Sequence, residues 1–342
     1  MELAMVGMNF RTAPLELREK VTFPPADIPQ MLGRMGARLP GAGIALLCTC
    51  NRTEVYALAE APELRKEALV DALLAVVGLS GGDEITAHLY ERTGVDALEH
   101  LIAVTASLDS MVVGETEILG QVKQAYRTAV EVQRDRKFLH GLFQGVLSAG
   151  KRVHSETGIS RGRVSVSSVA VSCAEKIFER LASRTVMVVG AGDTSEKALK
   201  TLVEKDAGQL FVLNRSADKA KRLAEHYGGE AVSLHLLPDY LPRADIVISS
   251  TQAPYHIIDA GTVRKAMEVR RGRPMLLIDI AVPRDIDRSV GELQDVHLYD
   301  IDDLRTVAEE GLLRRQAAVE AAWRVVREET QKLAEALALR GG

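Results

Sequence analysis

The sequence has few cysteines, no excess of basic residues and no long apolar run, and each of these shortages excludes a class of protein. Three cysteines with no Cys-x-x-Cys pair argue against a disulfide framework and against a structural zinc site, so no metal is expected. With 43 Lys and Arg against 47 Asp and Glu, the net charge of −4 excludes a polybasic protein. No apolar run approaches the ~18 residues of a membrane span, and the N-terminus lacks a basic, signal-like start. These shortages favour a protein of the reducing cytoplasm without membrane association.

The apolar residues are sufficient for more than one core. Hydrophobic residues make up 46% of the 342 residues, and at roughly 100 to 200 residues per domain this length predicts two domains with a small appendage. We expect an α/β protein with a mixed α+β domain over residues 1–160, a doubly wound domain over 161–300 and one long helix over 301–342.

The first 160 residues alternate short apolar runs with amphipathic stretches, which is typical of a mixed α+β domain. The patterns that lead to this expectation predict strands at 1–10 and 43–48, and helices at 62–77, 95–113, 120–133 and 138–156.

From residue 184 onward the apolar runs are continuous instead of alternating, and helical patterns separate them. Strands are predicted at 184–190, 209–214, 244–250 and 274–280, with helices at 194–205 and 217–227. Continuous apolar strands separated by helices indicate a parallel sheet covered on both faces, which is the doubly wound, Rossmann-type architecture.

A glycine turn stands between the first of these strands and the helix after it, Gly190-Ala191-Gly192-Asp193-Thr194-Ser195. In a dinucleotide-binding turn the first glycine permits the tight bend, the second lets the backbone approach the pyrophosphate, and the helix N-terminus faces the negative charge. Ser195 replaces the usual third Gly or Ala but is also small. The six residues are therefore expected to bind a dinucleotide cofactor.

The end of the second strand indicates which dinucleotide is bound. Asn214 and Arg215 stand where a protein specific for NAD usually places an Asp or Glu against the ribose 2′-hydroxyl. Arg215 can instead pair with a 2′-phosphate, which favours NADPH. The alternative is an arginine that is merely solvated in a surface turn.

Cys50 is the candidate nucleophile. Its neighbours Thr49, Asn51 and Arg52 are polar or charged, which is unusual for an inert core thiol, whereas Cys48 continues the apolar strand and is expected to be buried. Arg52 is expected to favour the thiolate, the form that attacks carbonyl carbon. A thiol nucleophile and an NADPH domain in one chain indicate formation of a thioester and its reduction to an aldehyde, or the same chemistry in reverse.

A histidine and a polar loop follow along the chain. His100, within the predicted helix 95–113, is a candidate general acid or base, or a pKa partner for Cys50; a structural histidine is the alternative. Beyond it, polar side chains are interleaved with glycines, a pattern typical of a substrate loop that leads into a helix. These residues are Ser110, Glu115, Thr116, Glu117 and Gln121.

Two further stretches have open interpretations. From 134 to 163 there are seven Lys and Arg against Asp135 and Glu156, a local net charge of +5, which describes either a solvated helix face or a phosphate-binding surface. From 303 onward no proline interrupts a helical pattern with an apolar residue every seventh position. Such a helix of roughly 35 residues would reach about 50 Å, and it packs either on a partner helix or on its own chain.

Several motifs together resemble the glutamyl-tRNA reductase family. They are Met5 to Pro14, Thr49-Cys-Asn-Arg-Thr-Glu-Val-Tyr56, Leu108-Asp-Ser-Met-Val-Val-Gly-Glu115, Ile118-Leu-Gly-Gln-Val-Lys-Gln-Ala125, Gly190-Ala-Gly-Asp193 and Asp279-Ile-Ala-Val-Pro-Arg-Asp-Ile286. The motifs extend over nearly the whole chain.

The resemblance implies an activity and a set of residue roles. Cys50 matches the family's nucleophile, which attacks the ester between glutamate and its tRNA, and His100 matches a histidine important for activity. NADPH would then reduce the thioester to glutamate 1-semialdehyde, in the first step of the five-carbon route to tetrapyrroles. The residues matching positions that hold the glutamyl group are Thr49, Asn51, Arg52, Ser110, Glu115, Thr116, Glu117 and Gln121.

The resemblance also implies partners. The family forms a homodimer and hands its unstable product to an aminomutase. About 40 residues follow Asp302, fewer than in the family's dimerisation domain, so the dimer is an open question from the sequence. The basic stretch 134–163 becomes a candidate tRNA surface.

Two other functions remain compatible with the same residues. One is reduction or oxidation of a different acyl or aldehyde substrate, which needs Cys50 and the glycine turn but no tRNA. The other is a non-catalytic relative that binds tRNA, NADPH or the aminomutase as a regulator.

Overall fold

The computed structural model describes residues 1–59, 66–79, 84–133, 137–160, 166–178, 180–304 and 316–337. The chain forms two compact units, Met1–Arg163 with Gly311–Gly342, and Val164–Glu310. The C-terminal segment therefore groups with the first unit. Among the helices within these described ranges, none combines the length and the apolarity needed to cross a membrane.

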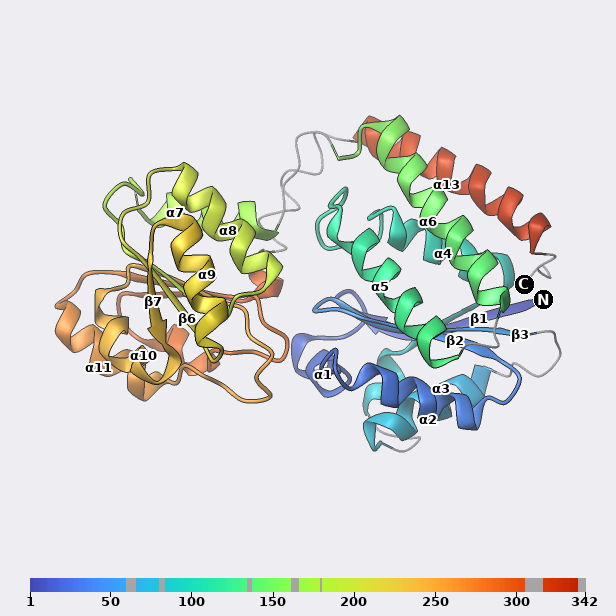
Figure 1. Ribbon diagram of the computed structural model, residues 1–342, viewed down its shortest axis with the longest axis horizontal. Coiled ribbons are helices and arrows are strands. Elements are labelled where there is room, and N and C mark those ends of the chain that lie inside the picture. Colours follow the sequence, from blue (N-terminus) through green and yellow to red (C-terminus); the bar gives the residue numbers. More distant parts are fainter. Residues whose placement is uncertain are drawn as a thin grey trace. The chain divides into compact units, whose positions relative to one another are not determined.

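The first unit contains an antiparallel sheet of four strands in the order β2-β3-β1-β4. Helices cover both faces, with α4, α5, α6 and α13 on one and α1, α2 and α3 on the other (Figure 1). The strands are β1 (Glu2–Asn9), β2 (Gly43–Cys48), β3 (Arg52–Ala59) and β4 (Tyr90–Thr93). The helices are α1 (Leu15–Lys20), α2 (Ile28–Arg38), α3 (Lys66–Val77), α4 (Gly94–Thr105), α5 (Glu117–Val132), α6 (Lys137–Thr157) and α13 (Gln316–Ala336).

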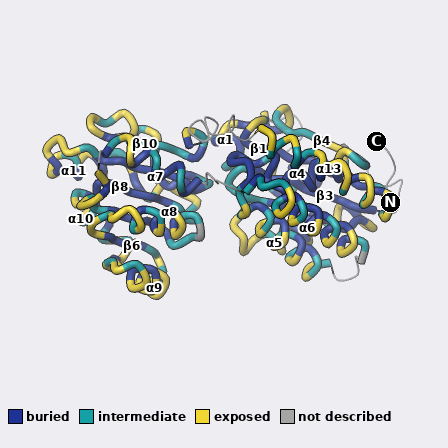
Figure 2. Tube along the Cα trace, turned by 90° about the horizontal axis from the view of Figure 1, so that it is seen from above, coloured by how far each residue is buried: buried dark blue, intermediate teal, exposed yellow. Residues whose placement is uncertain are grey.

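The central strands are buried on both faces because helices cover both faces. Every residue of β3 is buried, as are seven of the eight residues of β1 (Figure 2). In the β1–β3 register Gly7 lies opposite Glu54 and Asn9 opposite Arg52. A Cβ atom on Gly7 would stand 2.7 Å from Cγ of Glu54, so the glycine provides the space that this carboxylate side chain occupies. The sheet thus carries charged side chains inside a core.

The predicted helix 95–113 is wrong at its C-terminal end. Helix α4 stops at Thr105, and Ser107 has a φ of +61°, a left-handed conformation that no helix continues through. The apolar run beyond it is buried in turns, where the amide of Gly114 donates to the carbonyl of Ser107 at 3.1 Å. Because the chain turns here, Asp109 reaches Arg52, the first residue of β3.

The C-terminal helix packs on its own chain. Helix α13 lies against α4 and α6, and Val326 of its apolar seam is completely buried. Val319 and Leu333 of the seam pack on the same core, while Leu312 lies outside the described residues. Of the two arrangements compatible with the heptad pattern, the structure describes the one in which the helix docks on its own unit.

The second unit is a parallel sheet of six strands in the order β10-β9-β8-β5-β6-β7, as the doubly wound prediction requires. Its order reverses between β5 and β8, and the carboxyl ends of strands at such a point form the usual crevice for a ligand. The strands are β5 (Val186–Val189), β6 (Leu210–Asn214), β7 (Glu230–Ser233), β8 (Ile246–Ser249), β9 (Met275–Asp279) and β10 (Val296–Tyr299). The helices are α7 (Val166–Ile177), α8 (Asp193–Glu204), α9 (Ala217–Tyr227), α10 (Leu237–Tyr240) and α11 (Ala260–Arg270).

Candidate active site

Cys50 lies in the tight turn that joins β2 to β3. Its neighbour Thr49 fixes the turn, because Oγ1 of Thr49 accepts from the amides of Asn51 and Arg52, both at 3.1 Å. From α1, the buried side chain of Arg18 donates to the carbonyl of Cys50 at 2.8 Å. The backbone around the thiol is therefore held from both sides.

The Cys50 thiol is in its neutral form in this environment. Burial raises its pKa to about 12, the carboxylates of Glu115 and Glu117 add to the rise, and Arg18 opposes it. The expectation that Arg52 favours the thiolate is wrong. The guanidinium of Arg52 pairs with the carboxylates of Glu54 and Asp109, and the cation that lowers the pKa of Cys50 is Arg18. A base or a bound substrate must therefore promote loss of the thiol proton.

Cys48, which was expected to be buried, is partly buried and packs against the core of the unit. Its Sγ accepts from the amide of Phe23 at 3.3 Å and lies 3.6 Å from Oγ1 of Thr53. Burial raises its pKa as well. The two thiols of the motif therefore differ in surroundings, with Cys48 in the strand and Cys50 in the turn.

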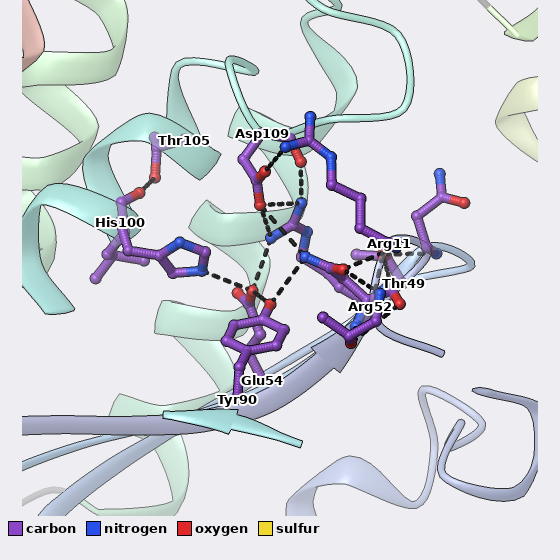
Figure 3. Close-up of polar contacts among 12 residues, drawn as sticks. Arg11, Thr49, Arg52, Glu54, Tyr90, His100, Thr105 and Asp109 are labelled. Atoms are coloured by element: carbon purple, nitrogen blue, oxygen red, sulfur yellow. Dashed lines mark hydrogen bonds and ion pairs between the residues drawn. The ribbon is translucent and has the colours of Figure 1, made fainter. Parts of the chain in front are cut away.

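A buried ionic network begins at Arg52, two residues after Cys50 (Figure 3). Nη1 of Arg52 donates to Oε1 of Glu54 at 2.7 Å, and Nη2 donates to Oδ2 of Asp109 at 3.1 Å. The Arg52 and Glu54 side chains are 1% and 0% exposed, so neither charge is solvated. Asp109 also pairs with Arg11 at 3.1 Å. Because the Arg11 side chain is exposed, this ion pair connects the network to the surface.

Glu54 is the centre of this network. Its carboxylate accepts from the hydroxyl of Tyr56 at 2.7 Å and from that of Tyr90, and it lies 2.9 Å from Nε2 of His100. Burial alone would raise the pKa of Glu54, but Arg52 and then His100 outweigh it and hold the pKa well below its usual range. His100 is thus oriented by a carboxylate that stays ionised.

Two buried polar atoms of the first unit lack a hydrogen-bond partner, one on Asn51, next to Cys50, and one on Ser110, next to Asp109. Oδ1 of Asn51 and Oγ of Ser110 are buried without a hydrogen bond. A buried polar atom left unpaired is costly, and such atoms in native proteins commonly await a ligand or water. Glu115 and Glu117 act electrostatically on Cys50 from the start of α5, whereas Thr116 and Gln121 are exposed there. The structure therefore places Asn51 and the electrostatic effect of two carboxylates at the thiol, and it holds Ser110 next to Asp109, which contacts Arg52.

In the second unit, the glycine turn has the geometry that a dinucleotide requires. Gly190 ends β5 with a φ of +96°, and a Cβ atom there would stand 2.4 Å from the carbonyl of Ser250. Gly192 caps α8, and the buried Ser195 donates to its carbonyl at 2.9 Å. The backbone of Ala191 and Thr194 completes the turn, while the side chain of Asp193 lies outside the described residues.

A cavity of about 350 Å³ adjoins this turn. Ala191 lines it together with Lys219 and Arg222 of α9, two cations that sequence reasoning missed although they follow Arg215 at helical spacing. Arg215 itself is exposed, and Asn214 accepts from the amide of Ser216 at 2.9 Å. The end of β6 thus offers positive charge to an anionic group.

A pair of buried carboxyls lies beyond β8 and β9 in the same unit. Asp285 accepts from Oγ of Ser249 at 2.6 Å and from the amide of Thr251 at 2.7 Å. Asp279 accepts from the amide of Ile286 at 2.8 Å, and burial, together with the nearby Asp285, raises its pKa to about 8. At neutral pH Asp279 is therefore largely protonated.

Comparison with known proteins follows the two units. Residues 6–157 match the family model of the glutamyl-tRNAGlu reductase N-terminal domain, and residues 172–307 match that of shikimate / quinate 5-dehydrogenase. The glutamyl-tRNA reductase of Shewanella amazonensis is 41% identical over 330 residues, which cover 96% of this chain and 78% of the relative. The chain belongs to the glutamyl-tRNA reductase family.

Other members of the glutamyl-tRNA reductase family agree in both sequence and fold. The reductase of Desulfitobacterium hafniense is 43% identical over 95% of this chain and 73% of its own length. The solved structure of the Methanopyrus kandleri glutamyl-tRNA reductase is 37% identical and matches with a TM-score of 0.51, covering 98% of this chain and 80% of that one. This member therefore combines the family's N-terminal domain with a dehydrogenase-type nucleotide-binding domain, which supports a nicotinamide cofactor.

In this glutamyl-tRNA reductase, some residues of the buried network belong to the sequence motifs but were not predicted to be site residues. Glu54 and Asp109 stand inside the quoted motifs, and the two-residue spacing of Arg52 and Glu54 on a strand was a signal that they share a face. Tyr90 and Arg11 carried no such signal, because their places depend on the pairing of β1 with β4 and on the turn after β1.

The basic stretch 134–163 is only partly available for phosphate. Arg152 of α6 pairs with Glu156 and with Glu328 and Glu329 of α13, at 3.0, 3.1 and 2.7 Å, so its charge is used to hold α13. Lys151 is exposed on the same helix. Arg134, Arg136, Arg161, Arg163 and the side chain of Lys137 lie outside the described residues.

Proposed function

We propose that this protein reduces glutamyl-tRNA to glutamate 1-semialdehyde with NADPH, through a thioester on Cys50. The observation that carries the proposal is a pair of unpartnered buried atoms in a chain of this family: Oδ1 of Asn51, next to Cys50, and Oγ of Ser110, next to Asp109, which contacts Arg52. The ammonium of a glutamyl group supplies donors for both oxygens. Glu115 and Glu117 provide further acceptors near the thiol.

The covalent step starts from a neutral thiol. Sγ of Cys50 forms a bond to the ester carbonyl carbon, the bond from that carbon to the ribose oxygen breaks, and the thiol proton passes to the ribose hydroxyl that leaves. When bound, NADPH supplies the hydride that converts the thioester to the aldehyde and releases the Cys50 thiolate. One proton taken up by that thiolate restores the starting enzyme.

His100 and its carboxylate partner support proton transfer in this scheme. Glu54 holds Nε2 of His100, so we assign exchange of the thiol proton to the other ring nitrogen, Nδ1. Arg18, which donates to the Cys50 carbonyl, stabilises the thiolate that the reduction releases. Thr49 keeps the turn in place, and Arg52 orients Glu54 and Asp109.

The cofactor is assigned as NADPH from the charge at the end of β6. The residues of the glycine turn, Gly190 to Ser195, would hold the pyrophosphate, and Arg215 with Lys219 the 2′-phosphate. Asn214 cannot act as the carboxylate that selects NAD. The change Arg215→Ala should raise KM for NADPH about tenfold and leave KM for NADH unchanged, since one charge-assisted contact is worth ~1.5 kcal/mol or more.

The partners follow from the proposed product. The aldehyde is reactive, so we expect its transfer to an aminomutase, and a homodimer like that implied for the family. Light scattering of the purified protein tests the dimer. All three cysteines are free thiols, which supports our prediction of a reducing cytoplasm.

The deciding experiment compares the two neighbouring thiols. Protein incubated with glutamyl-tRNA and NADPH should form semialdehyde, Cys50→Ser should abolish this, and the matched control Cys48→Ser should retain most of it. Glutamate labelled with ¹⁴C should be trapped on Cys50 when NADPH is omitted. Turnover of other acyl substrates but not of glutamyl-tRNA would favour a different acyl reductase. Binding of tRNA without any turnover would favour a regulator.

A further inference from the structure

The first residues of the loop that follows β8, residues 250–257, pack against the glycine turn of the second unit. The amide of Ser250 donates to the carbonyl of Val189, the last residue of β5, at 2.9 Å. A Cβ atom on Gly190 would collide with the carbonyl oxygen of Ser250 and stand 3.1 Å from Cγ2 of Thr251. Because β5 and β8 are neighbours where the strand order reverses, this loop is one wall of the crevice in which a dinucleotide is expected.

Ser250 presents a hydroxyl to the second glycine of the turn. A Cβ atom on Gly192 would stand 3.4 Å from Oγ of Ser250, and within the described part of the chain this hydroxyl has no hydrogen-bond partner. In a dinucleotide-binding turn the second glycine is the place where the backbone approaches the pyrophosphate. A hydroxyl beside it can therefore donate to a pyrophosphate oxygen, in addition to the amides at the N-terminus of α8.

One buried carboxylate fixes the position of this loop. The side chain of Asp285 accepts from Oγ of Ser249 at 2.6 Å, from the amide of Thr251 at 2.7 Å and from Oγ1 of Thr251. These donors belong to the residues immediately before and after Ser250. The backbone carbonyl of Asp285 also accepts from the amide of Ile258 at 3.0 Å, where the loop ends. Asp285 therefore holds the loop on both sides of Ser250 and again at its end.

We propose that the Ser250 hydroxyl binds the pyrophosphate of the cofactor, and that Asp285 is a positioning residue that holds this hydroxyl against the glycine turn. The inference rests on one part of the proposed function, the occupation of the turn by a nicotinamide dinucleotide. Asp285 belongs to the motif Asp279 to Ile286, so this motif acts on the cofactor through the loop after β8.

Calorimetric titration with NADP⁺ in the absence of tRNA tests the contact. Ser250→Ala should weaken NADP⁺ binding about tenfold or more, the range expected for loss of one hydrogen bond to a charged group. Asp285→Ala removes the acceptor of all three donors and should weaken binding to a similar or larger extent. An unchanged affinity in Ser250→Ala would overturn the inference.

A double variant separates positioning from general damage to the fold. If Asp285 acts through Ser250, the protein with both alanines should bind NADP⁺ no more weakly than Asp285→Ala alone, whereas two independent losses would multiply. Asp279→Ala is the matched control, because Asp279 is buried in the same segment and its hydrogen bonds to the amides of Ala281 and Ile286 stay within that segment. Its NADP⁺ affinity should stay within about twofold of the parent. Multiplied losses in the double variant, or an equal loss in Asp279→Ala, would refute positioning by Asp285.

Ser249→Ala keeps the test decisive if Asp285→Ala does not fold. It removes one of the three donors, and loss of one such hydrogen bond should weaken NADP⁺ binding about threefold. Unchanged affinity in Ser249→Ala would then refute positioning by Asp285.

The outcomes also separate this inference from the proposed reaction, because NADP⁺ binding needs no tRNA. Weaker NADP⁺ binding in Ser250→Ala would support the inference even if the parent formed no semialdehyde, a result that would defeat the proposed reaction. Semialdehyde formation by the parent, together with parental NADP⁺ affinity in Ser250→Ala, would defeat this inference alone.

Discussion

Nε2 of His100 lies 2.9 Å from Oε1 of Glu54, and this carboxylate is completely buried. The pairing joins α4 to β3 across 46 residues of sequence. It also ties the histidine to the Arg52 and Asp109 network. The arrangement thus joins two fully buried charges, Arg52 and Glu54, to His100 and to the partly exposed Asp109.

Replacing Glu54 by Gln should destabilise the first unit strongly. The change leaves the buried guanidinium of Arg52 with only Asp109 as its carboxylate partner, and breaking a buried pair costs about 3 kcal/mol or more. Urea denaturation at pH 7 measures this loss. The matched control, Glu91→Gln on the exposed part of β4, should stay within ~0.5 kcal/mol of the parent.

The pH dependence of the same variant has a defined sign. Because the folded pKa of Glu54 is depressed, its contribution is present above the unfolded value of about 4.3 and is lost as the pH falls toward the lower folded value. The stability gap between parent and Glu54→Gln should therefore narrow below about pH 4. A gap that is constant down to pH 3 would contradict the assignment.

Alkylation of Cys50 should be slow at neutral pH in the free protein. With a pKa of about 12, the rate with iodoacetamide should rise through pH 10 without levelling off. Glu115→Gln removes a negative charge that opposes the thiolate, so the rate at pH 8 should increase severalfold. Glu131→Gln, at the far end of α5, is the control and should match the parent. A plateau near pH 8 in the parent would show that the thiol is activated before substrate binds.

Lys151 and Arg152, two adjacent cations of α6, should behave differently on substitution. Lys151→Glu should weaken tRNA binding and lower the salt slope by about one, as expected for the loss of one phosphate contact. Arg152→Glu places like charges against Glu328 and Glu329, so the backbone amides of α13 should exchange hydrogen faster. An unchanged tRNA affinity in Lys151→Glu would remove this helix face from the tRNA surface.

Gly190 should tolerate no side chain, in contrast to another glycine with positive φ in the same unit. Gly190→Ala brings a methyl group to within 2.4 Å of the Ser250 carbonyl and should abolish NADPH binding in calorimetry. Gly228→Ala, with a φ of +72° and open space around it, should cost only the ~1 to 2 kcal/mol of the left-handed conformation and keep binding. Equal binding by both variants would contradict the assigned turn.

The buried acid Asp279 should make the second unit less stable as the pH rises. Its folded pKa of about 8 lies above the unfolded value of about 3.9, so stability falls between these values, where the unfolded chain loses the proton first. Asp279→Asn should flatten that decline, whatever its effect on absolute stability. Melting temperatures at pH 5 and pH 8, measured for both proteins, test this, and an equal decline in the variant would refute it.

Much of the fold was predictable because it depends on local pattern. The strand at 43–48 and the helix at 217–227 have the bounds that were expected, since a short continuous apolar run indicates a strand and apolar residues three and four apart indicate a helix face. The glycine turn was predictable for a related reason: Gly190 is required by its own backbone angle. The end of the predicted helix 95–113 was not, because the buried turns after Thr105 are as apolar as a helix.

The sequence by itself determined the polar turn around Cys50, the glycine turn from Gly190 to Ser195, the doubly wound sheet and, through its motifs, the family. Only the tertiary structure decided what each charge does. In the folded chain Arg52 pairs with Glu54 and Asp109 instead of acting on Cys50, and His100 contacts Glu54. Trp323 lines the same cavity as His100 and Asp109 although it is more than 200 residues away in the sequence. The physical reason is that periodicity identifies which side chains are buried, whereas their partners depend on how distant segments pack together.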